Sequence, residues 1–205
     1  MELFIMKKIF FPLITGALLS VPFIFANTEA QAAGNTSNSS TNVKLEVIPG
    51  DFSVKFKDSN NKFDDVNLNG AKTSSVALND LYVTDLSGTG HGYEVTLAAT
   101  QFKSINDNKT IPTQSLMLNS VPKGEAIGDD PTTSPIPKNL GKDIFLDAVD
   151  TGTGGVILSA DRDEGMGEYK YSFSKDNLSF AANAGDLYSG TYQTVITADM
   201  HVPVK

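Results

Sequence analysis

Alternation of apolar and polar residues with a period of two is the feature that most constrains the fold of this chain. It recurs from Val43 onward, for example in Phe52–Phe56, Tyr93–Leu97 and Tyr169–Phe173. Such alternation indicates strands with one buried face. Glycine-rich turns such as Ser87–Gly90 separate these stretches. The pattern predicts an all-β fold, a single antiparallel β-sandwich or barrel-like domain.

Further strands are expected over residues 43–47, 76–85, 116–121 and 192–200. No stretch has a convincing helical stripe, and the best short candidate is Leu140–Val149, which has apolar residues recurring every four positions. Four prolines between residues 122 and 138 predict a loop, because proline cannot donate to a strand ladder. A loop of this length is either functional or an insertion tolerated at the surface.

The first 32 residues have the features of a secretory signal peptide. Lys7 and Lys8 precede the apolar run Ile9–Ala26, and Ala30–Ala32 (Ala-Gln-Ala) supplies a cleavage site. An uncleaved membrane anchor is the less favoured alternative, because two prolines interrupt the run. The expected organisation is a signal peptide over residues 1–32, a flexible polar leader over 33–42 and a β domain over 43–205. The protein is expected to be secreted.

The composition argues against several classes of function. The net charge is −8 and there is a single arginine, whereas a nucleic-acid partner would favour clusters of Lys and Arg. The chain has no cysteine, which excludes disulfides, thiol catalysis, iron–sulfur clusters and cysteine zinc sites. Two histidines are too few for a histidine-based zinc site. We therefore expect no metal ligands, no cofactor and no nucleic-acid partner.

Candidate catalytic groups do not form a recognisable pattern. His91 follows Asp85 and Ser87, yet a Ser-His-Asp triad also needs an oriented base and an oxyanion site. The acidic stretch Asp161–Glu164 could offer oxygens to Ca²⁺, but its spacing and the competing Arg162 favour a solvated turn. Carboxylates are numerous enough that a glycosidase pair could arise by chance. The sequence predicts a protein that is not an enzyme.

Two regions resemble the WxL-domain family of exported surface proteins of Gram-positive bacteria. Val83–Phe102 reads VTDLSGTGHGYEVTLAATQF. The family has there a strand ending in Asp, a glycine-containing turn and Gly-Trp-x-Leu at the start of a Thr-rich strand. Leu187–Tyr192 and the strand after it resemble the end of the family's domain. The second Trp-x-Leu of the family would fall at Ala198–Met200.

This resemblance implies non-covalent binding to peptidoglycan through the signature positions. These positions are Gly92, Tyr93, Val95, Ala198 and Met200, with Tyr93 and Ala198 in place of the two signature tryptophans. If the tryptophans contact glycan, binding should be weaker here; if they are core residues, Tyr93 and Met200 can substitute. We expect Tyr93 to be part-buried, with its hydroxyl reaching a polar partner.

The expected function is that of a non-catalytic protein associated with the Gram-positive cell wall. Its expected partners are peptidoglycan or another wall glycan, and other surface proteins. The first alternative is a structural or accessory subunit of an extracellular fibre, biofilm matrix or surface complex, in which sheet edges mediate contact. The second is a hydrolase of wall or matrix polysaccharide, for which the sequence offers no constellation of residues.

Overall fold

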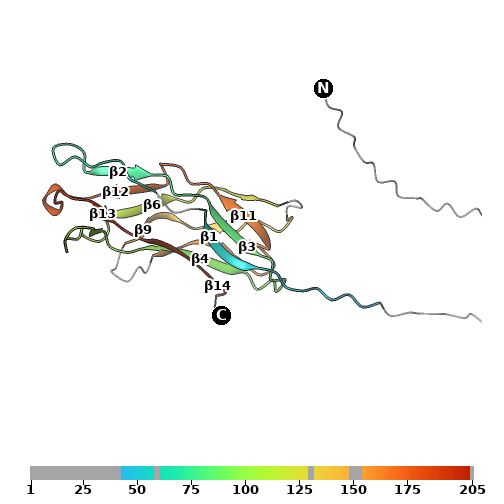
Figure 1. The fold of residues 1–205 in the computed structure, drawn as a ribbon. Coiled ribbons are helices and arrows are strands. Elements are labelled where there is room, and N and C mark those ends of the chain that lie inside the picture. The colour runs from blue at the N-terminus through green and yellow to red at the C-terminus, as the bar shows by residue number, and fades with distance from the viewer. Residues whose placement is uncertain (1–42, 58–60, 129–131, 148–153, 204–205) are drawn as a thin grey trace, which may run out of the picture. The chain divides into compact units, whose positions relative to one another are not determined.

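The computed structural model describes residues 43–57, 61–128, 132–147 and 154–203. Glu46–Lys205 form one compact unit, whose described elements are antiparallel strands and one short 3₁₀ turn, Ala184–Asp186 (Figure 1). The expected signal peptide and leader lie outside the described residues. Within the described part of the chain, no helix is long and apolar enough to span a membrane.

Two four-stranded sheets lie end to end and form the first layer (Figure 1). One has the order β1–β3–β11–β7, from Phe52–Phe56, Leu81–Asp85, Gly167–Tyr171 and Gly124–Ala126. The other has the order β2–β12–β6–β9, from Thr73–Val76, Leu178–Ala181, Leu116–Ser120 and Lys142–Phe145. The chain passes between them at β2 to β3, β6 to β7 and β11 to β12. The two sheets therefore continue each other.

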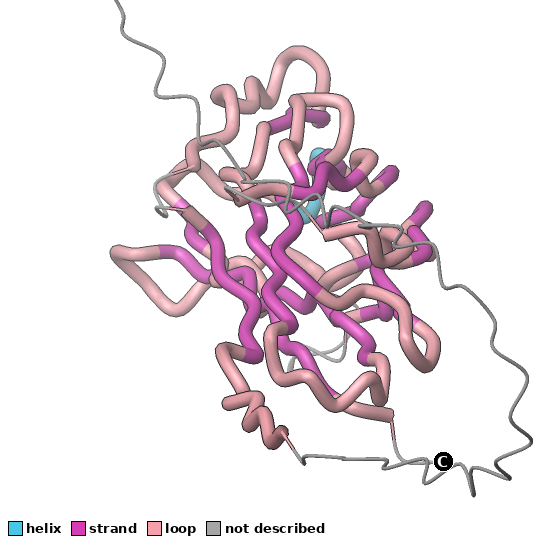
Figure 2. The backbone as a smooth tube through the Cα atoms, turned by 90° about the vertical axis from the view of Figure 1, so that its right-hand side faces the viewer, coloured by secondary structure: helices cyan, strands magenta, loops and turns pink. Residues whose placement is uncertain are grey.

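A third four-stranded sheet forms the second layer. Its order is β14–β4–β10–β8, from Ile196–His201, Tyr93–Ala99, Gly155–Ala160 and Lys138–Asn139. Two short strands pair beside this sheet. β5, Lys103–Ser104, comes after β4 in the chain, and β13, Tyr192–Gln193, comes before β14. Figure 2 shows the strands of the layers around a shared interior, with loops joining them at both ends. The predicted all-β sandwich is confirmed.

The core lies between the layers and consists of the faces that the alternation predicted. Tyr93, Val95 and Leu97 of β4 are completely buried, and so are Tyr169 and Tyr171 of β11, the latter to within 1%. These side chains belong to one continuous apolar cluster. Period-two patterning therefore identified which face of each strand would meet the other layer.

The sequence missed the strand at the centre of the second layer. β10 carries a continuous apolar run, Val156–Leu158, rather than an alternating one. The register of its pairing with β4 shifts between Val156 and Leu158, which is a β-bulge, and both Ile157 and Leu158 are buried. A bulge places two consecutive residues against one partner and so breaks the period of two.

Three other expectations differ from the structure. Residues 43–47 form no strand, and Val43, Leu45 and Val47 are 89%, 89% and 78% exposed. The helix candidate contains β9 instead, because Lys142–Phe145 pairs with β6; its last two residues lie outside the described residues. The proline-rich loop contains β7, which fits between two prolines at a sheet edge where a ladder is needed on one side only.

Alkaline pH is expected to destabilise the domain. Burial raises the pKa of the Tyr93 and Tyr171 hydroxyls above their usual value. The unfolded chain therefore loses these protons at lower pH than the folded chain does. The stabilisation is complete below about pH 10 and is lost above it, by up to about 1.4 kcal/mol per pH unit for each tyrosine.

Urea unfolding midpoints across this pH range measure the effect. Tyr171→Phe removes one of the two groups and should reduce the pH dependence, whereas midpoints independent of alkaline pH would contradict it.

Candidate functional site

The two signature regions, far apart in sequence, lie side by side in the structure. β4 and β14 pair antiparallel, so that Val95 lies opposite Met200 and Leu97 lies opposite Ala198. One register therefore fixes both regions relative to each other. The structure thus brings together the residues that the resemblance selected.

The signature side chains face the core. Tyr93 and Val95 are completely buried, while Ala198 and Met200 are partly buried and pack against the core. The opposite face of the ribbon is polar, and its strands carry Glu94, Thr96, Thr197, Asp199 and His201. Direct contact of the signature residues with a ligand stays a prediction.

Gly92 occupies a position that only glycine fits. Its φ is +75°, and a Cβ at this residue would lie 2.7 Å from the carbonyl oxygen of Asp161 and closer still to that of Ala160. A left-handed backbone and this close approach both exclude larger residues. Gly92 thus lets the start of β4 touch the chain that follows β10.

The Tyr93 side chain connects β4 to a cluster of loops. Its hydroxyl donates a 3.1 Å hydrogen bond to the carbonyl oxygen of Gly165, and its ring meets that of Phe52 edge-on with centroids 6.0 Å apart. The Gly165 amide in turn donates to the Pro135 carbonyl. The expected polar partner of Tyr93 is confirmed, and its burial is complete rather than partial.

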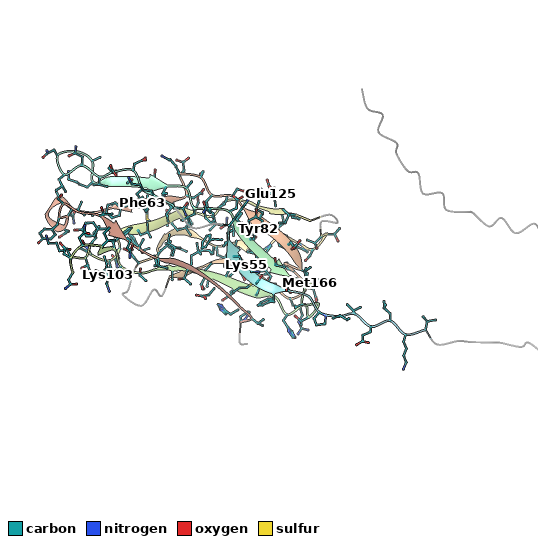
Figure 3. The ribbon with its side chains drawn as sticks, in the orientation of Figure 1. Lys55, Phe63, Tyr82, Lys103, Glu125 and Met166 are labelled. Carbon is teal, nitrogen blue, oxygen red and sulfur yellow. The ribbon has the colours of Figure 1, made fainter. Side chains whose placement is uncertain are left out.

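An open pocket of about 520 Å³ lies among the loops at this end of the domain. Figure 3 labels Met166, one of its lining residues, and shows it at the end of the domain away from Phe63. The described lining residues are Asp85, Leu86, Gly88, Ile127, Gly128, Thr132, Met166, Gly167 and Glu168. Since Met166 and Gly167 directly follow Gly165, the Tyr93 hydrogen bond holds one wall of the pocket.

The pocket combines apolar and acidic groups. Leu86, Ile127 and Met166 supply apolar surface, while Asp85 and Glu168 supply carboxylates. Asp85 is 2% exposed, and its Oδ1 accepts hydrogen bonds from the Ser87 amide at 3.1 Å and the Ser87 hydroxyl at 2.6 Å. Asp85 is thus buried and occupied by Ser87, whereas the partly exposed Glu168 carboxylate suits hydroxyl, amide or ammonium donors of a sugar or peptide. Because the pocket is open, a ligand in it would lie against these groups with one side facing solvent.

Comparison with known protein families finds the WxL domain, described as a surface cell wall-binding domain, over residues 25–200. The chain belongs to the WxL family. No curated protein and no solved structure matches the chain significantly. The matched region of this WxL protein includes both signature regions, and it supports association with the cell wall at the cell surface.

The other sequence candidates have structural roles in the WxL domain. The Ser87 hydroxyl donates its hydrogen bond to Asp85. In a Ser-His-Asp triad, the serine hydroxyl would instead donate to the histidine. Asp161 and Glu164 lie in a turn, where both face the ammonium group of Lys138. Among the described residues, no three side chains of the metal-ligating types gather into a cluster.

Sequence reasoning missed most of the pocket. Met166 and Glu168 lie within or beside the short glycine-rich turn before β11, and Ile127 directly follows β7. The available sequence signal was the glycines Gly88, Gly128 and Gly167, which mark tight turns. All three have positive φ in the structure. Nothing in the sequence indicated that these three turns meet at one end of the sandwich.

Proposed function

We propose that this WxL protein is secreted, is non-catalytic and binds the peptidoglycan of Gram-positive walls in the pocket at the Tyr93 end of the domain. One observation carries the proposal. The residue at the family's first signature position ties down the loop that forms a wall of the pocket. In this proposal the signature residues do not touch the ligand. They lie in the core and hold the loop that forms the wall of the pocket.

The chemistry of the pocket supports this ligand class. Peptidoglycan consists of N-acetylated sugars and short peptides, which carry many hydrogen-bond donors beside small apolar groups. Glu168 can accept hydrogen bonds from such donors, while Met166 and Leu86 can pack against methyl groups or sugar C–H faces. Other wall glycans share part of this chemistry and are the competing ligands in the test.

Glu168→Gln is expected to weaken binding to purified wall sacculi by about tenfold, because it removes a charged hydrogen-bond acceptor. The measurement is co-sedimentation of the protein with sacculi over a range of protein concentrations. The matched control is Asp199→Asn, which changes an exposed carboxylate on the outer face of β14 and leaves the pocket intact.

Two results would speak against the proposed site. If Asp199→Asn loses sacculus binding and Glu168→Gln keeps it, the binding site lies on the outer face of the β4–β14 ribbon. Equal binding of wild-type protein to sacculi stripped of all other glycans and to unrelated polysaccharide would remove peptidoglycan as the specific ligand.

A further inference from the structure

The segment before β1 has the sequence of a strand but pairs with no strand among the described residues. Residues 43–48 read VKLEVI, and the side chains of Val43, Leu45, Val47 and Ile48 are between 78% and 89% exposed. A short apolar alternation of this kind is normally stabilised by pairing within a sheet. We refer to residues 43–48 as the arm.

An edge that could receive the arm lies on β7. β7 pairs with β11 on one side, and among the described residues no strand lies on its other side. The Ile127 amide donates to the Glu168 carbonyl of β11. In an antiparallel ladder, the amides and carbonyls of Gly124 and Ala126 therefore point away from β11. Such a row of unpaired backbone groups is a template for an added strand.

A side-chain group is also left unpaired at this edge. Gly124 lies directly over the ring of Tyr171, because a Cβ at Gly124 would come within 2.7 Å of that ring. The Tyr171 hydroxyl is the buried side-chain polar atom that has no hydrogen-bond partner within the described structure. The unpaired backbone groups of Gly124 and Ala126 are therefore what leaves the β7 edge incomplete, while the Tyr171 ring fills its core side.

The charges of the two segments fit in one register. If the arm runs antiparallel to β7 with Lys44 opposite Glu125, then Glu46 falls opposite Lys123. A parallel arrangement with the same residues in contact would place Lys beside Lys and Glu beside Glu, which is unfavourable. Glu125 already lies 3.9 Å from Lys170 of β11, and Figure 3 shows Glu125 at the side of the sheet away from Lys55 of β1.

The same register places the apolar residues of the arm over the core side of the edge. Leu45 falls opposite Gly124, which is buried and faces the core. Val43 falls opposite Ala126, which packs against the core. Polar pairs on the outside and apolar pairs on the inside therefore occur together, as they do in a native sheet.

The arm cannot reach the β7 edge of its own chain. β1 and β7 are the opposite edges of one four-stranded sheet, so a strand beyond β7 would lie about 19 Å from β1 at the usual strand spacing. Gly50 is held at the β1 side by its hydrogen bond to Leu86. In the register above, the paired residue nearest to Gly50 is Glu46, and the four residue steps between them span at most about 14 Å. The partner must be another molecule.

We propose that the arm of one copy adds as an antiparallel strand to β7 of a second copy. The contact joins two different surfaces, so every copy in the assembly still offers one arm and one edge. Such a head-to-tail contact builds open chains unless its rotation closes a ring. This assembly goes beyond wall binding and does not depend on the pocket.

The test is sedimentation velocity of residues 33–205 over a wide range of protein concentrations, without wall material. Wild-type protein should form oligomers that grow with concentration. Leu45→Asp should raise the dissociation constant more than about tenfold, since Leu45 becomes buried in the proposed contact and contributes most of its apolar area. Leu68→Asp is the matched control, because Leu68 is also an exposed leucine but lies outside both the arm and β7.

Charge reversal tests the register. Lys44→Glu and Glu125→Lys should each weaken association by roughly twofold to fivefold. Because Lys170 stays beside residue 125, the two together should recover tighter association than Glu125→Lys alone. A protein that stays monomeric, or one in which Leu45→Asp behaves like Leu68→Asp, overturns the proposal. Failure of the double variant to recover overturns the register on β7. Sacculus binding is unaffected by any of these outcomes, so the two proposals fail separately.

Discussion

Replacing Tyr93 with alanine is expected to destabilise the domain by about 3–5 kcal/mol. The ring is completely buried against Phe52, so its removal leaves a cavity and forfeits its transfer free energy. The Gly165 carbonyl also loses its hydrogen bond from the Tyr93 hydroxyl. Urea unfolding followed by far-ultraviolet circular dichroism measures the change. Sacculus binding by the protein that is still folded should also weaken, because the wall of the pocket loses the hydrogen bond that holds it.

Met200→Ala and Tyr93→Phe are the controls for this prediction. Met200 is only partly buried at the paired signature position, so its truncation should destabilise the domain in the same way but less. Tyr93→Phe removes the hydroxyl alone and should cost about 1 kcal/mol. A Tyr93→Ala variant that keeps its stability but loses wall binding would show that Tyr93 is a ligand contact and that the packing account is wrong.

The sequence predicted those parts of the fold that rest on local pattern. Alternation in β1, β4, β11 and β14 identified strands and their buried faces, because a half-buried strand needs apolar residues at every second position. It also predicted a strand over the arm, where the structure has none. The pattern records which face of a segment is apolar, but a strand also requires a neighbour, which local sequence does not specify.

The remaining parts depend on tertiary pairing. The segment that contains β9 has the apolar spacing of a helix. It forms an edge strand instead, because it pairs with β6 from Met117 and Phe145 to Ser120 and Lys142. β7 follows a proline and is too short to show alternation. The candidate pocket needs loops that are far apart in sequence, and a single hydrogen bond from Tyr93 sets its wall. The resemblance located Tyr93 without revealing that it acts from inside the core.

The carboxylate of Asp147 has a structural role that the sequence did not reveal. Asp147 is completely buried. Its Oδ2 accepts hydrogen bonds from the Ser115 amide at 3.1 Å and the Ser115 hydroxyl at 2.8 Å. Its Oδ1 accepts one from the Leu116 amide at 3.0 Å. These three bonds fix the start of β6. Gln114, two residues before the strand, has a φ of 63°.

Asp147→Ala is expected to destabilise the domain by about 3–5 kcal/mol. The substitution leaves three donors without an acceptor in a region that water does not reach, and each buried unsatisfied group costs about 1–3 kcal/mol. Because β6 is an inner strand of its sheet, the loss should spread to its neighbours β12 and β9. Hydrogen exchange at the Ser115 and Leu116 amides should speed up more than exchange elsewhere in the domain.

Asp65→Ala provides the comparison for the loss of a carboxylate as such. Asp65 forms an ion pair with Lys62 in which both side chains are more than four-fifths exposed, and exposed pairs contribute little to stability. Its removal should change the free energy of unfolding by less than about 0.5 kcal/mol. If urea denaturation finds Asp147→Ala as stable as Asp65→Ala, the three hydrogen bonds do not hold β6 in place. If Asp147→Asn instead falls between the two, the carboxylate is needed in full, because the amide replaces one acceptor oxygen with a donor.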